Sequence, residues 1–158
     1  MESQEIGKHA ALQKLKDWDN QAVAEVIEFR GESTVVVPPQ HLVRVAEYLV
    51  SEPSLRFTFL SDLTTVDRFP MEPRFELNYH LLSIDRGLRL RLRLRLPGAE
   101  PAVASVTGIW PTANWHEREN FDLFGIRFHG HPDLRRILMP DEWEGHPLRK
   151  DYPVEGFR

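Results

Sequence analysis

The segment Leu88–Leu96 reads LRLRLRLRL and alternates leucine with arginine over its whole length. Successive side chains of a β-strand point to opposite faces of the sheet, so this pattern predicts a strand with one leucine face and one arginine face. The leucines are expected in the core. A solvated surface is the favoured interpretation of the other face, with binding of phosphate or of a carboxylate-rich partner as the alternative. That face carries Arg89, Arg91, Arg93 and Arg95.

The residues on both sides of this strand predict further strands. Arg86-Gly87 predicts a tight turn from the strand before it, and Pro70–Pro73 separates two longer β-type runs. Val103–Val106 is too short to assign. The expected strands before Leu88 are Val23–Phe29, Ser33–Val37, Phe57–Phe69 and Arg74–Asp85.

Two helices are predicted between these strands and the N-terminus. Lys8–Trp18 has apolar residues at helical spacing, and a second helix opens at Pro38-Pro39 and stops before Pro53. Helices that are separate from paired antiparallel strands favour an α+β fold, a two-layer α/β sandwich with a mixed β-sheet. We expect a single domain, with an α/β core over residues 1–110 and a charged helix and an extended strap over residues 111–158.

Composition excludes several classes of function. Of the 158 residues 28% are charged, and the net charge of −4 argues against nonspecific nucleic-acid binding. The chain has no cysteine, which excludes a disulfide, a thiolate nucleophile and a cysteine-bound cluster within it. The N-terminus lacks the apolar run of a signal peptide, and no apolar stretch is long enough to span a membrane, so a cytoplasmic chain is expected.

The segment Asn114–Val154 concentrates the chemistry of the chain. It begins as a charged helix, for which Asn114 is the expected N-cap and Gly125 the expected left-handed stop. Arg118 lies one turn before Asp122, so an ion pair within the helix is expected. The residues after the helix, 126–158, are rich in Trp, Arg, His and Pro, and we call them the C-terminal strap. Such a segment forms either an active-site loop or a surface for another protein.

Catalytic interpretations of this segment are weak. His116-Glu117 opens like the H-E-x-x-H zinc motif, but Asn120 stands where the second histidine is required. Paired carboxylates of Glu117, Glu119 and Asp122 are explained in part by helix capping and salt bridges. A metal hydrolase is the minor alternative. Its ligands would be His129, His131, Asp133 and His146.

An interface fits the strap better. Trp, Tyr and Arg are enriched where proteins bind one another, and guanidinium groups pair with partner carboxylates. We therefore predict no catalytic, cofactor or metal residues and a partner interface along the helix and the strap. Its members are Glu117, Arg118, Glu119, Asp122, His131, Arg135, Arg136, Trp143, His146, Arg149, Lys150, Asp151 and Tyr152.

The same residues resemble a known family. Glu117-Arg118-Glu119-x-x-Asp122-Leu-Phe-Gly125, followed by His131 and Arg135-x-Ile-Leu, is similar to the signature of the thirty-kilodalton subunit of respiratory complex I, NADH:quinone oxidoreductase. Trp143-Glu-Gly-His-Pro-Leu-Arg-Lys-Asp-Tyr-Pro153 resembles the second hallmark of that family.

This resemblance implies a non-catalytic subunit of the peripheral arm. It implies docking on the large quinone-site subunit, on the cytoplasmic side of the inner membrane, with membrane contact only through the complex. FMN, iron–sulfur clusters and quinone would belong to partner subunits, and this chain would carry no cofactor. The alternative within the resemblance is an equivalent scaffold in a membrane-bound hydrogenase or a ferredoxin-driven complex.

Overall fold

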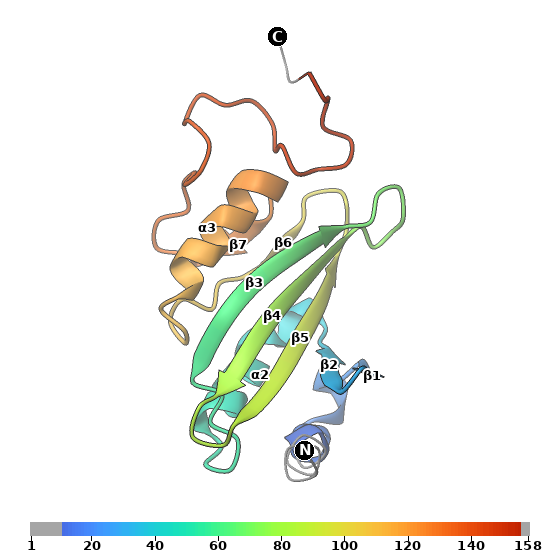
Figure 1. The fold of residues 1–158 in the computed structure, drawn as a ribbon, viewed down its shortest axis with the longest axis vertical. Helices are drawn as coiled ribbons and strands as arrows, with labels where there is room; N and C mark the ends of the chain where they lie inside the picture. The colour runs from blue at the N-terminus through green and yellow to red at the C-terminus, as the bar shows by residue number, and fades with distance from the viewer. Residues whose placement is uncertain (1–10, 156–158) are drawn as a thin grey trace.

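A five-stranded mixed sheet forms the centre of the molecule in the computed structural model, which describes residues 11–155. The strands lie in the order β1-β2-β5-β4-β3 (Figure 1). Only β2 and β5 run parallel to each other, and every other neighbouring pair is antiparallel. The strands are β1 (Glu25–Phe29), β2 (Glu32–Val36), β3 (Phe59–Asp67), β4 (Phe75–Ser83) and β5 (Leu88–Leu96).

The alternation along β5 is confirmed. All five leucines of the strand are buried, whereas its arginines are exposed or partly exposed. β4 pairs with β5 along the full length of both strands, from Phe75 opposite Leu96 to Ser83 opposite Leu88. β5 has the predicted bounds and β2 is shifted by one residue, whereas β1, β3 and β4 are shorter than predicted by one or two residues at one or both ends.

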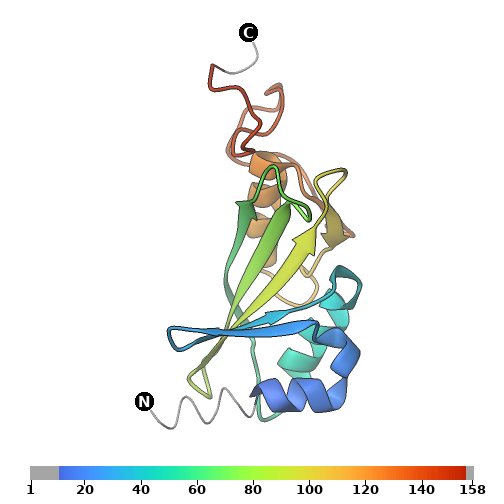
Figure 2. The same cartoon turned by 90° about the vertical axis from the view of Figure 1, so that its right-hand side faces the viewer.

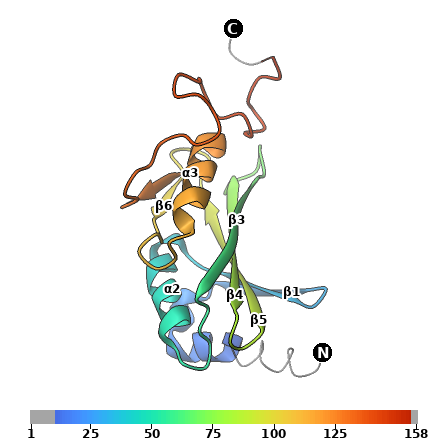
Figure 3. The same cartoon turned by 60° about the vertical axis from the view of Figure 1, so that its left-hand side comes forward.

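Helices cover one face of the sheet and leave the other face open (Figure 3). α2 (Leu42–Ser51) follows a single 3₁₀ turn, η2 (Pro39–His41), and its buried residues are Leu42, Val45, Ala46 and Leu49. The predicted N-terminal helix is helical over residues 11–18, and its first residues lie outside the described part of the chain. Trp18 of that helix stacks on Tyr48 of α2 with ring centroids 4.4 Å apart. The predicted two-layer α+β architecture is therefore confirmed.

The β1–β2 hairpin projects from the open side of the sheet, away from the helices (Figures 2 and 3). Its two-residue turn, Arg30-Gly31, has positive φ at both positions, as the tight hairpin turn requires. A short 3₁₀ turn, η1 (Asn20–Ala22), leads into this hairpin.

The last part of the chain contains one pairing that the sequence did not predict. β6 (Ala102–Ala104) and β7 (Arg127–His129) pair as a parallel two-stranded sheet. In the sequence they come before and after α3 (Ala113–Phe124). After β7 the strap runs as turns and irregular backbone along the C-terminal end of α3 and the adjacent sheet end (Figure 1). Among residues 11–155, no helix combines the length and apolar character needed to cross a membrane.

Candidate functional site

α3 turns a polar face toward the protein. Its buried residues are Ala113, Glu117, Asn120 and Asp122, so side chains that usually face water are enclosed here. Asn120 accepts a hydrogen bond from Thr65 and donates to the carbonyl oxygens of Leu63 and His116. A buried amide with all these bonds fixes α3 against β3. This accounts for asparagine where a zinc motif would need histidine.

Asp122 connects α3 to the strap. One carboxylate oxygen accepts hydrogen bonds from three consecutive backbone N–H groups of the strap, those of Ile137, Leu138 and Met139, at 2.8–3.0 Å. The other oxygen accepts from Arg136 at 2.6 Å. Burial disfavours the charged carboxylate, but these hydrogen bonds outweigh it and lower the pKa of Asp122. The carboxylate is thus held ionised as a structural anchor.

The predicted Arg118–Asp122 ion pair is wrong. Arg118 instead donates to the carbonyl oxygens of Arg135 and Arg136, and the guanidinium on Asp122 is that of Arg136. Arg136 also donates to the carbonyl oxygens of Trp143 and Gly145. The strap thus gives Arg118 two carbonyl acceptors, and Arg136 takes its place on Asp122.

The predicted N-cap is also wrong, whereas the predicted C-terminal stop is confirmed. α3 begins at Ala113, with Thr112 at the cap position and no side-chain capping bond. The backbone N–H groups of Ala113 and Asn114 already donate to the carbonyl oxygens of Trp110 and Pro111. Gly125 ends the helix with φ +74. A Cβ on Gly125 would lie 2.5 Å from the ring of His146, so the strap packs directly on this turn.

His146 and Arg149 hold the next part of the strap. The His146 ring lies edge-on to Phe121 of α3, and its Nδ1 is 2.9 Å from the carbonyl oxygen of Asp122. Burial lowers the pKa of His146. Arg149 donates to the carbonyl oxygen of Phe124 and lies over the ring of Phe75. Both side chains predicted as interface residues therefore bind the protein's own helix end.

A buried arginine fastens the end of the strap to the β3–β4 hairpin. Arg74 makes paired hydrogen bonds to Asp67 and to Asp151 of the strap, at 2.6–2.8 Å. The backbone N–H of Lys150 also donates to Asp67. Burial disfavours the charge on Asp67, but these bonds and one from the N–H of Phe69 lower its pKa to about 2. We call Arg74, Asp67 and Asp151 the latch.

Glu117 is the buried carboxyl group of α3 that lacks a cationic partner. It accepts hydrogen bonds from the backbone N–H of Val106 and the hydroxyl of Ser105, at 2.8 and 2.6 Å. Burial raises its pKa to about 7, although both hydrogen bonds act in the opposite direction. This group joins α3 to the loop after β6.

The imidazoles of the hydrolase alternative have separate surroundings. His131 contacts the carbonyl oxygen of Asn114 and accepts from the backbone N–H of Asp133, while His146 lies on Asp122. His129 is exposed. Within residues 11–155, no three His, Asp or Glu side chains gather in a way that could hold a metal ion.

Several predicted interface residues stay on the surface. Glu119, Trp143 and Lys150 are exposed, and Arg135 is exposed and paired with Asp133. Tyr152 is half-buried, and its hydroxyl donates to the carbonyl oxygen of Glu144.

Exposed apolar side chains lie along α3 and the strap as well. Trp115 is 71% exposed and Leu138 61% exposed, although Glu117, Asn120 and Asp122 of α3 are buried. We define the docking surface as these exposed apolar residues: Trp115, Ile137, Leu138, Trp143 and Leu148.

Sequence reasoning missed Trp115, Asn120 and the latch partners Asp67 and Arg74. Asp67 and Arg74 flank the Pro70–Pro73 turn, and a charge pair bracketing a proline turn was the available signal. Trp115 lies within the charged helix and is 71% exposed.

Comparison with known proteins identifies a family. Residues 35–158 match the family model described as respiratory-chain NADH dehydrogenase, 30 Kd subunit. The NADH-quinone oxidoreductase C subunit of Roseiflexus sp. (strain RS-1) is 50% identical over 143 residues, which cover 90% of this chain and 82% of that one. The same subunit of Geotalea uraniireducens (strain Rf4) is 47% identical over 92% of this chain and 88% of its own length.

Two solved structures share the fold. A trypsin-resistant fragment (1-134) of Nqo5 has a TM-score of 0.67 at 30% identity, over 81% of this chain and 99% of that fragment. A chain of an archaeal respiratory membrane complex, the membrane-bound sulfane sulfur reductase, has a TM-score of 0.79 at 24% identity. That match covers 93% of this chain and 86% of the archaeal chain.

Proposed function

Because this chain belongs to the family of the 30 kDa subunit of respiratory-chain NADH dehydrogenase, we propose that it is a structural subunit of a proton-translocating NADH:quinone oxidoreductase. In this role it sits in the peripheral arm and carries out no catalysis on its own. It supports electron transfer from NADH to quinone by holding other subunits in place.

The observation that carries this proposal is that polar and apolar side chains of α3 and the strap face different ways. The polar groups of Asp122, Arg136 and His146 form hydrogen bonds that fix the strap to α3, while apolar side chains are exposed. A pre-ordered segment with exposed Trp and Leu loses little conformational freedom on binding, which favours a stable interface.

The occupant that we propose for the docking surface is the large quinone-site subunit. Trp143 and Leu138 act as its apolar anchors, and the exposed charges of Glu119, Arg135 and Lys150 form part of the surrounding rim. Buried members of the predicted interface, such as Asp122 and Arg136, act indirectly by shaping the strap.

The remaining parts of the reaction belong to other subunits in this proposal. FMN, the iron–sulfur clusters and the quinone are bound by partners, and the chain reaches the cytoplasmic side of the inner membrane through them. The lack of cysteine is consistent with an absence of clusters in this chain.

Copurification tests the docking surface. Leu138→Asp combined with Trp143→Asp should reduce the amount of large subunit that copurifies after mild-detergent extraction at least tenfold, because two apolar anchors become charged. Ile84→Asp is the matched control, since Ile84 is 65% exposed but lies in the β4–β5 turn, outside the docking surface. Unchanged assembly and quinone reduction in the double variant would refute the proposed surface.

A further inference from the structure

The open face of the sheet carries the arginines of β5, and most of them are neutralised within the chain. Arg91 binds Glu32, Arg93 donates to Asn78, and Arg95 binds Glu25. Arg93 and Arg95 also lie 3.8 and 3.7 Å from Glu76. These contacts explain three of the four arginines as part of a solvated sheet face.

Arg89 is different. Within the described residues it has no ion pair and no hydrogen bond, although its position on the strand matches that of the other three. Its cross-strand neighbour on β4 is Leu82, which offers no charge. A guanidinium that no carboxylate neutralises therefore stands on a face where the other three have partners.

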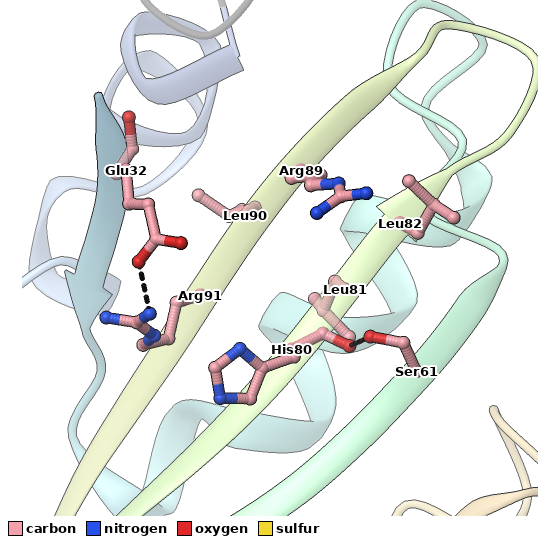
Figure 4. Close-up of a pocket in the computed structure, with 9 residues that line it drawn as sticks. Glu32, Ser61, His80, Leu81, Leu82, Arg89, Leu90 and Arg91 are labelled. Atoms are coloured by element: carbon pink, nitrogen blue, oxygen red, sulfur yellow. Dashed lines mark hydrogen bonds and ion pairs between the residues drawn. The ribbon is translucent and has the colours of Figure 1, made fainter. Parts of the chain in front are cut away.

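Arg89 also lines a pocket on this open face (Figure 4). The pocket has a volume of about 260 Å³, and Arg91, His80 and Ser61 contribute to its walls. Figure 4 shows these side chains in front of the strands, with α2 behind them, and the Arg91–Glu32 pair at one side. Ser61 is the extra residue where the β3–β4 register shifts, so a β-bulge lies at the pocket wall.

The rim of the pocket is partly apolar. Phe29 lies opposite Glu32 in the β1–β2 pairing and is 66% exposed. Phe59 lies opposite Leu82 in the β3–β4 pairing and is 40% exposed. Each aromatic residue lies on an edge strand, opposite a residue that lines the pocket. Aromatic residues and arginine are both enriched at protein–protein interfaces.

We propose that this pocket is a second docking site, in which Arg89 binds the carboxylate of an Asp or Glu side chain of another subunit. The guanidinium supplies two parallel N–H donors, which match the two oxygens of a carboxylate. The neighbouring Glu32 is already bound to Arg91, so the guanidinium of Arg89 keeps a positive charge in the pocket without a paired carboxylate. The aromatic rim receives the apolar residues that flank the acid.

The size of the pocket favours a side chain over a cofactor. Small-molecule sites usually enclose about 300–1,000 Å³, whereas this pocket is smaller and open to solvent at the sheet surface. A carboxylate side chain fits that volume and brings its own polypeptide over Phe29 and Phe59. His80 of β4, which lies opposite Arg91, can donate an N–H to the same carboxylate.

This inference relies on the proposed assembly role but concerns a different face of the molecule, so each can fail alone. The test uses the purified complex with R89K, which keeps the charge and introduces an amine. A zero-length carbodiimide joins an amine to a touching carboxylate, and peptide mass spectrometry locates the product. The expected product is an isopeptide bond from position 89 to an Asp or Glu of another subunit.

The matched control is R95K on the same strand and face. Arg95 pairs with Glu25 of its own chain, so the control should give a cross-link within the chain. If the control reacts and position 89 gives only intrachain products or none, the docking site is wrong. Binding of inorganic phosphate to the isolated chain, followed by the His80 resonances, without a cross-link to another subunit would reassign the pocket to a free anion and overturn the proposal.

Charge reversal gives an independent measure. R89E should weaken retention of the cross-linked subunit roughly tenfold or more, because interfacial ion pairs commonly contribute that much. Replacing the identified partner carboxylate by lysine in the same complex should restore retention. Equal loss in the single and the combined variants would show that Arg89 and that carboxylate do not interact.

Discussion

The guanidinium of Arg136 and the carboxylate of Asp122 meet 2.6 Å apart, and their side chains are 14% and 0% exposed. The two residues are fourteen apart in the sequence, and their hydrogen bond joins the strap to α3. Because the same carboxylate also accepts three strap N–H groups, Asp122 fixes the strap over residues 136–139.

Replacing Asp122 should release the strap. Asp122→Ala leaves a buried guanidinium without its carboxylate and three N–H groups without an acceptor, a loss of about 3–5 kcal/mol. We expect trypsin to cleave after Arg135 and Arg136 much faster than in the unaltered chain, with the core intact. Asp141→Ala, an exposed position of the strap, is the control and should digest at the normal rate. Equal rates for both variants would contradict the anchoring role.

How far the sequence predicts this fold depends on the range of each interaction. The leucine–arginine alternation identifies β5 because a period of two is local to the strand. The partner of Asp122 could not be found in this way, since helix spacing points to Arg118 and the true partner lies in the strap. Spacing rules identify neighbours on one helix or strand. They do not identify a partner that only the tertiary fold brings close.

α3 shows the same limit. Its buried face is made of Glu117, Asn120 and Asp122, so it has no apolar stripe from which to predict the side that faces the protein. β6 and β7 are three residues each, too short for any periodic signal. Trp143 is the one member of the proposed docking surface that the sequence analysis had selected, because Trp is a typical interface residue.

The latch should hold the last part of the strap independently of Asp122. Asp151→Ala removes one partner of Arg74 but leaves Asp67 in place, so we expect faster trypsin cleavage after Arg149 and Lys150 with little change in the free energy of unfolding. Arg74→Ala should be more harmful, because it also leaves the carboxylate of Asp67 buried without its cation. If the double variant Arg74→Ala/Asp151→Ala is no better than the sum of the single losses in urea unfolding, the two residues are not coupled.

Gly125 should tolerate no side chain. Alanine there is strained by about 1–2 kcal/mol at φ +74, and its Cβ would also overlap the His146 ring. We expect Gly125→Ala to lower the midpoint of thermal unfolding and to expose the strap to trypsin. The variant Gly125→Ala/His146→Ala separates the two causes, since it relieves the overlap with the His146 ring but keeps the backbone strain and the 2.8 Å approach to Nη2 of Arg149. A double variant that recovers nothing would rule out the contact with His146.

The raised pKa of Glu117 predicts a pH dependence of stability. Burial raises this pKa to about 7 in the folded chain, against 4.5 as the ordinary value expected after unfolding. Between these values the unfolded chain releases the proton and the folded chain keeps it, so the free energy of unfolding falls as the pH rises. The full loss is on the order of 3 kcal/mol at about 1.4 kcal/mol per pKa unit, and it is complete above pH 7.

Glu117→Gln should remove that slope, because the amide stays neutral and can still accept from the N–H of Val106. Urea unfolding at several pH values from 4.5 to 8 measures the difference between the variant and the unaltered chain. This difference should shift in favour of the variant as the pH rises, and it should level off above pH 7. Glu119→Gln, an exposed position of the same helix, should follow the unaltered chain. A difference that is independent of pH would mean that Glu117 is ionised throughout, and that Ser105 and Val106 stabilise the anion enough to cancel the effect of burial.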